Sequence, residues 1–190
     1  LLRNWYFVQT AAINPEAQGV AFKDEVMGRL IQFVSSHEVG HTLGLPHNMG
    51  SSAAYPVDSL RSASFTSKYG TAPSIMDYAR FNYVAQPEDK GVALMPNIGV
   101  YDKYAIEWGY RPILDKTAEE EKPVLDSWIM AHDGDPLYRF GSQQGGDVVD
   151  PSSQTEDLGD NAMKASMYGI KNLQRIVPKL IEWTAEDGKN

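Results

Sequence analysis

Three of the four histidines in this chain of 190 residues lie within one segment of eleven residues, from His37 to His47. On an α-helix, residues four apart share a face, with Cβ atoms about 5–6 Å from one another. His37 and His41 would therefore hold two imidazoles side by side. This segment predicts a helix through His41, and no other feature constrains the fold as strongly.

The residues after His41 predict where that helix ends. If the helix continued, His47 would point about 240° around the axis from His41. Gly44 can adopt the left-handed conformation that commonly ends helices, and Pro46 disfavours helical geometry at Leu45. We therefore expect the chain to turn back after Gly44 and to bring His47 to the two helical histidines.

Three imidazoles with an open fourth position are typical of a catalytic zinc site, because a structural site is closed by a fourth side chain. The chain has no cysteine that could close it. Glu38 is turned about 100° from His37, where it can reach a zinc-bound water rather than the metal. The segment predicts Zn²⁺ on His37, His41 and His47, with Glu38 as general base.

Two alternatives to this zinc site remain open. In the first, His37 and His41 are core histidines whose ring nitrogens are satisfied by hydrogen bonds. In the second, the chain is a different zinc hydrolase, in which a downstream glutamate replaces His47 as third ligand. Gly44 and His47 favour the three-histidine site over both.

The composition of the chain limits the kinds of molecule that it can be expected to bind. The chain is 42% hydrophobic and 22% charged, as globular domains are, and its net charge is -8. The negative charge argues against nucleic acid and anionic membranes as partners. No apolar run approaches the roughly 18 residues of a transmembrane segment.

Apolar periodicity predicts helices over residues 1–13, 21–44, 100–108 and 161–183. We expect Gly109 to end the third of these and Pro178 to kink or break the fourth. Tyr101, Tyr104 and Trp108 would form a core-facing stripe. A shorter solvated helix is expected from residue 117, whereas residues 48–73 are rich in Ser, Ala, Gly and Pro and predict irregular loop.

Three further candidates are weaker. His132 has no motif partner, which predicts an exposed loop residue. The acidic stretch from Asp147 to Asp160 could bind calcium, although it lacks the spacing of an EF-hand and solvated loop is the simpler interpretation. Asp77 could support a zinc-bound histidine by a hydrogen bond, or cap a turn.

The motif of His37, Glu38, His41, Gly44 and His47 resembles that of the metzincin superfamily of zinc metallopeptidases. In metzincins, a methionine in a tight turn lies beneath the zinc ligands as an apolar floor. The methionine of Ser-Ile-Met-Asp-Tyr at residues 74–78 matches that turn. A thioether is a soft gap-filler that packs well against imidazoles, so a floor role for Met76 is chemically reasonable.

The wider stretch of residues 37–110 resembles a metzincin group found in large secreted or envelope proteins of Bacteroidetes-type bacteria. Tyr78 resembles a tyrosine of astacin-like and serralysin-like enzymes that ligates zinc and then swings to stabilise the transition state. A plain packing tyrosine is the alternative. Asn48 differs from the Asp, Ser or Glu of other branches, so their specificity rules are not transferred.

The resemblance also implies a fold. Metzincin domains place a twisted β-sheet before the zinc helix, and an edge strand of that sheet aligns the substrate. The 36 residues before His37 have helical periodicity instead. We therefore expect a mainly α fragment with long irregular loops and the upstream sheet largely absent. Residues 1–190 would form one partial metzincin-like catalytic domain, with the zinc-site helix at 21–44, a C-terminal subdomain with the Met-turn at 45–110 and a helical extension at 111–190.

The function implied is a zinc-dependent endopeptidase that cleaves protein or peptide substrates. Its expected partner is the N-terminal region of the same parent protein, and its expected location is extracytoplasmic. The alternative is a non-catalytic, zinc-containing binding or structural module of a larger envelope protein.

Overall fold

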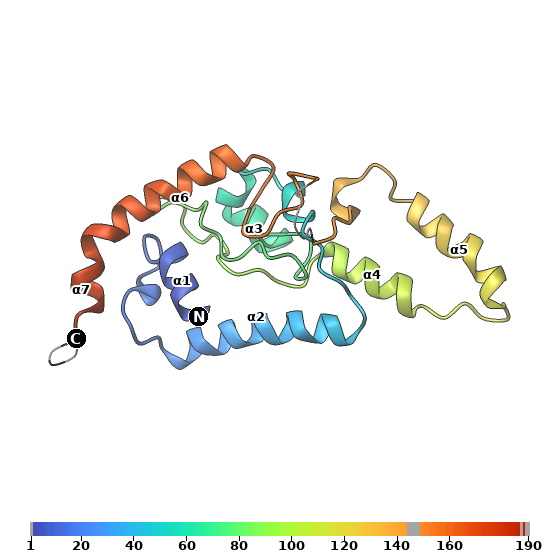
Figure 1. Cartoon of the computed structure of the whole chain (residues 1–190), viewed down its shortest axis with the longest axis horizontal. Coiled ribbons are helices and arrows are strands. Elements are labelled where there is room, and N and C mark those ends of the chain that lie inside the picture. The colour runs from blue at the N-terminus through green and yellow to red at the C-terminus, as the bar shows by residue number, and fades with distance from the viewer. Residues whose placement is uncertain (1, 144–148, 187, 189–190) are drawn as a thin grey trace.

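The computed structural model describes residues 2–143, 149–186 and 188, and it consists of helices joined by long loops (Figure 1). No β-strand occurs among these described residues. The predicted mainly α fold with long irregular loops is confirmed. The α-helices are α1 (Leu2–Thr10), α2 (Asp24–Thr42), α3 (Ala63–Tyr69), α4 (Val100–Tyr110), α5 (Ala118–Met130), α6 (Ala162–Ile176) and α7 (Leu180–Thr184). Short 3₁₀ helices lie at η1 (Pro15–Ala17), η2 (Ser52–Ala54), η3 (Ser59–Arg61), η4 (Pro136–Tyr138) and η5 (Val177–Lys179).

The first core forms between α1, α2 and the loop that follows α3. Buried apolar residues of α2 recur at helical spacing through Val26, Leu30 and Phe33, which is the pattern of a helix with one face in a core. Tyr6 of α1 packs edge-on against Phe81, with ring centroids 4.9 Å apart. This core fixes α2 along one side of the molecule (Figure 1).

A second core lies under α3 and α6. Its buried members come from the loop before α3, from the loop after it and from the C-terminal region: Tyr55, Val57, Leu60, Ala72, Ala79, Val84, Leu158 and Ala165. Figure 1 shows α6 along the upper left of the molecule, with one end near α3, although the two helices are far apart in the sequence. The C-terminal region is therefore part of the same packed body as the candidate site.

Helices α4 and α5 form an arm at the end of the molecule away from α7 (Figure 1). No residue of α5 is buried. The predicted core-facing aromatic stripe on α4 is confirmed only in part, because Tyr101 and Tyr104 are half-buried, Trp108 is exposed, and the residue of α4 that is buried is Asp102. Its carboxylate accepts hydrogen bonds from Gly99 N at the start of α4 and from Ile75 N at 2.8 Å, so α4 is tied to the central loop by a polar contact.

Several helix ends differ from those predicted. α4 continues through Gly109 to Tyr110, because a glycine inside a helix costs only about 1 kcal/mol and does not by itself end it. The segment 48–73 contains α3 and two 3₁₀ helices, so its prediction as loop throughout is wrong. The predicted break at Pro178 is confirmed, since η5 separates α6 from α7.

None of the helices in the described ranges is long and apolar enough to cross a membrane.

Candidate metal centre

The end of α2 places His37 and His41 on one face and then reverses the chain. Their ring centroids are 4.8 Å apart. Beyond Thr42 the backbone forms a Schellman motif, in which Leu45 N donates to Gly40 O and Gly44 N donates to His41 O, both at 3.0 Å. Gly44 has a φ of +85°, the left-handed conformation expected from the sequence. The predicted turn after α2 is therefore confirmed.

The two helical histidines are oriented by backbone carbonyls. The Nδ1 of His37 lies 2.7 Å from Ile75 O, and the Nδ1 of His41 lies 2.9 Å from Leu45 O. A carbonyl only accepts, so each Nδ1 carries the proton and each Nε2 keeps its lone pair. Burial lowers the pKa of the His37 imidazole, which favours the neutral, metal-binding form. Ligation through Nε2 with Nδ1 donating to a carbonyl is a common arrangement at zinc sites.

His47 is oriented in a different way. Its Nδ1 lies 2.6 Å from Oε1 of Gln143, a side chain 96 residues further along the chain. The amide oxygen accepts as a carbonyl does, so the Nδ1 of His47 also carries its proton. Nothing in the sequence motif pointed to Gln143, because no spacing rule links positions so far apart.

The Nε2 atoms of the three histidines converge. Their candidate ligand atoms all lie within 4.8 Å of one another, and the Nε2 atoms of His41 and His47 are 3.0 Å apart. With both Nδ1 atoms protonated, these two lone pairs cannot hydrogen-bond each other. The Nε2 of His37 is buried without a hydrogen-bond partner. A shared cation satisfies all three nitrogens, and three imidazoles suit zinc.

Met76 lies beneath the end of α2. It is buried, and its sulfur is so close to Gly40 that a Cβ at that glycine would lie 2.4 Å from Sδ. The carbonyl of Met76 accepts from Asn48 N at 3.0 Å, and its own N–H donates to Ser74 Oγ at 3.0 Å. The methionine therefore fills the space below the histidines, as an apolar floor would.

Glu38 and Tyr78 lie beside the three histidines. Glu38 is exposed on α2, one residue after His37. The ring of Tyr78 lies against two imidazoles, with centroids 4.6 Å from His47 and 5.4 Å from His37. The guanidinium of Arg80 covers another part of the Tyr78 ring at 4.8 Å. The structure thus brings His37, His41, His47 and Tyr78 into one cluster, and Glu38 is the neighbour of His37 on α2.

Asp77 does not contact a histidine. Its Oδ2 accepts from Ser51 Oγ at 3.0 Å and from Ser52 N at 2.7 Å, so it holds the loop after His47 onto the Met76 turn. Neither role predicted for Asp77 is seen, because its hydrogen bonds go to the loop after His47 and not to a histidine or to its own turn. Ile75 supplies that support to His37 through its carbonyl instead.

The remaining sequence candidates have structural roles. His132 is half-buried and stacks on Tyr138 at 3.7 Å, so the predicted exposed loop residue is wrong. In the acidic stretch, Glu156 pairs with Arg80 and Asp160 accepts from Val57 N. Asp147 lies outside the described residues. Within the described part of the chain, the three histidines form the only group arranged to hold a metal ion.

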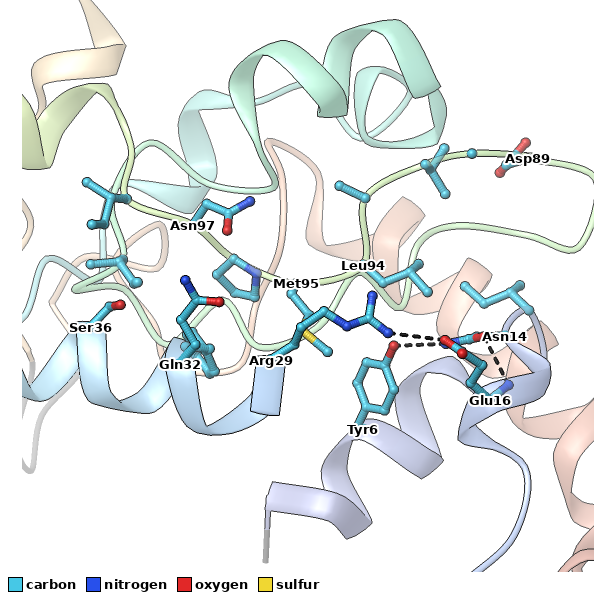
Figure 2. A pocket seen from close by; sticks show the side chains of 18 of the residues that line it. Tyr6, Asn14, Glu16, Arg29, Gln32, Ser36, Asp89, Leu94, Met95 and Asn97 are labelled. Atoms are coloured by element: carbon cyan, nitrogen blue, oxygen red, sulfur yellow. Dashed lines mark hydrogen bonds and ion pairs between the residues drawn. The ribbon is translucent and has the colours of Figure 1, made fainter. Parts of the chain in front are cut away.

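A separate cavity of about 840 Å³ lies along the first half of α2. Figure 2 shows Arg29, Gln32 and Ser36 of α2 facing the loop that carries Met95 and Asn97, with Arg29 paired to Glu16. None of the three histidines lines it. The cavity is therefore distinct from the cluster of imidazoles.

A comparison with protein families matches residues 19–190 to a family model described as Met-zincin. The match covers α2, the three histidines and the C-terminal region that contains Gln143. Comparisons with curated proteins and with solved structures found no match.

Proposed function

Since the chain belongs to the Met-zincin family, we propose that it is the zinc-binding part of an endopeptidase that hydrolyses peptide bonds in protein or peptide substrates. The observation that carries the proposal is the convergence of three Nε2 atoms whose Nδ1 partners are all acceptors. His37, His41 and His47 would hold Zn²⁺ and leave one position open. An open position is what separates a catalytic zinc site from a structural one.

The proposed mechanism assigns a proton-transfer role to Glu38. When bound, zinc lowers the pKa of water to about 7 and polarises the scissile carbonyl. The exposed carboxylate of Glu38 takes the proton of the attacking water and passes it to the leaving amine. Because Glu38 follows His37 by one residue, it is turned about 100° around α2 from that histidine and would lie beside the metal, where it is available for this role rather than for ligation.

Tyr78 is proposed to stabilise the transition state. Its ring packs against His37 and His47, so Tyr78 is a neighbour of two of the proposed zinc ligands. There it would donate a hydrogen bond to the developing oxyanion. The packing of Arg80 on the same ring limits how far the ring travels.

The proposal extends to the setting of the enzyme. The resemblance of residues 37–110 to secreted and envelope metzincins supports an extracytoplasmic location and an upstream region of the same protein as partner. The substrate strand of a metzincin would come from that region.

The test is cleavage profiling against a complex peptide pool, with Glu38→Gln beside the parent protein. Loss of a general base typically lowers the rate by about 10²–10⁴-fold, and zinc content should not change. Glu25→Gln, an exposed glutamate near the start of the same helix, is the control and should cleave as the parent does. Equal cleavage by Glu38→Gln would eliminate this base. Zinc binding without cleavage of any pool would favour the non-catalytic module.

A further inference from the structure

The third histidine depends on a distant part of the chain, and the contacts at that point are unusually close. Asn48, the residue after His47, is buried and makes two hydrogen bonds with the segment 139–141. Its Nδ2 donates to Arg139 O at 3.0 Å, and its Oδ1 accepts from Gly141 N at 2.9 Å. The amide group of Asn48 therefore uses both its donor and its acceptor on one short stretch of backbone.

A backbone contact between two glycines reinforces this clamp. A Cβ at Gly141 would lie 2.8 Å from the Cα of Gly50, and a Cβ at Gly50 would lie 3.1 Å from the Cα of Gly141. Ser153 fills the adjacent space, with its Oγ 2.2 Å from the position of a Cβ at Gly141. We call the contact of residues 48–50 with residues 139–141 the glycine seam.

Gln143 follows the glycine seam by two residues and reaches back to His47. Its Oε1 lies 2.6 Å from Nδ1 of the imidazole. The side chain is exposed, so it is free to contact water, and its position against His47 follows from where the seam places its backbone. His37 and His41 need no such help, because backbone carbonyls hold them.

We propose that Gln143 is the positioning residue that sets the tautomer and orientation of His47 as the third metal ligand, and that Asn48 holds Gln143 in place through the glycine seam. The inference rests on the proposed zinc site. It assigns a task to the C-terminal region: one of its side chains completes the support of the metal centre. It also explains why an asparagine suits position 48, since only a group with one donor and one acceptor satisfies both contacts.

The experiment is zinc affinity of the full chain, measured by competition with a chromophoric chelator. Gln143→Leu removes the acceptor and should weaken zinc binding by about 10–100-fold, as is typical for loss of a partner behind a metal-bound histidine. Gln143→Glu keeps an oxygen acceptor and should restore affinity to within a few fold of the parent. Gln154→Leu is the matched control, because Gln154 is exposed in the same region and donates only to the nearby Pro151 O at 2.7 Å.

A second readout separates positioning from folding. The metal-free forms of Gln143→Leu and the parent should unfold at the same denaturant concentration, whereas the visible spectrum of the Co²⁺-loaded Gln143→Leu protein should differ from that of the parent. Parent-like affinity and spectrum in Gln143→Leu would overturn the inference, and so would a failure of Gln143→Glu to restore binding. His47→Ala separates the two proposals: if it binds zinc as the parent does, the zinc site itself is wrong.

Discussion

His41 takes its Nδ1 acceptor from Leu45, four residues along the chain, whereas His47 takes its acceptor from Gln143, 96 residues away. One proposed ligand is thus oriented by the turn that ends α2, and the other by Gln143, a side chain that follows the glycine seam. A local turn forms wherever α2 forms. The seam exists only when the C-terminal region is folded against the site. The candidate site therefore has a local half, which is the end of α2 with His37, His41 and Gly44, and a long-range half, which is His47 with Gln143 and the glycine seam.

The largest expected effect is on the local half. His41→Ala removes a proposed ligand, and zinc affinity should fall by more than the roughly 100-fold that is the upper limit for loss of an outer partner such as Gln143. Isothermal titration with Zn²⁺ measures this. His132→Ala removes the fourth histidine, which stacks on Tyr138 away from the cluster, and should leave affinity unchanged. A larger loss of zinc affinity in Gln143→Leu than in His41→Ala would contradict this ranking of the two halves.

The next effect is on the long-range half. Gly141→Ala places a Cβ against Ser153 Oγ and the backbone of Gly50, so the seam must open. Overpacking of this kind costs about 1–3 kcal/mol of unfolding free energy, measured by urea denaturation. The zinc affinity of Gly141→Ala should fall together with its unfolding free energy. Gly109→Ala is the control, because a Cβ there meets nothing within 4 Å. If Gly141→Ala unfolds and binds zinc as the parent does, the seam does not support His47.

A smaller effect is expected below the helical histidines. Gly40→Ala places a Cβ 2.4 Å from Met76 Sδ, and a flexible thioether can move further than a backbone can, so a loss of about 1 kcal/mol of unfolding free energy is expected. Gly28→Ala on the same helix meets nothing within 4 Å and should stabilise by about 0.5–1 kcal/mol. Thermal unfolding of both variants checks the pair. Equal stability changes would show that Met76 does not press on α2.

The smallest expected effect is a pH dependence of the unfolding free energy, which arises where the C-terminal region packs on the loop after His47. Burial raises the pKa of Asp157, which contacts Ser52 Oγ at 3.3 Å, to about 6. Because the folded state keeps this proton to higher pH than the unfolded chain, its contribution to stability is full below pH 4 and is lost as pH rises through about 6. Asp157→Asn should reduce the pH dependence of urea stability over that window, and Asp77, whose pKa burial raises to about 7, should keep the rest. A variant with the parent's pH slope would assign the dependence to other groups.

The local half of the site was predictable and the long-range half was not. Spacing placed His37 and His41 on one face, and Gly44 fixed the turn, because both effects act within one or two turns of helix. The contacts of Ile75 with His37 and of Gln143 with His47 could not be found this way, since tertiary packing sets both. Asn48 was the available signal: its difference from other metzincin branches marked a position with a separate task.

The fold shows the same division. The helices with long apolar periodicity were predicted, and so was the break at Pro178, because each depends on neighbours in the sequence. α3 was missed because seven residues bear too little periodicity to distinguish them from loop. The stripe on α4 was only partly right, because periodicity shows which residues share a face and leaves open how much of that face is covered. Asp102 ties α4 to the central loop, and Tyr104 packs against Tyr138.

The central claim is that three Nε2 atoms hold one zinc ion with a position left open. Zinc K-edge absorption of the zinc-loaded protein tests it most directly. We expect three imidazole nitrogens at about 2.0–2.1 Å and a light oxygen ligand completing the shell, with one imidazole lost in His47→Ala. A spectrum with two imidazoles in the parent, or one unchanged by His47→Ala, would contradict the account.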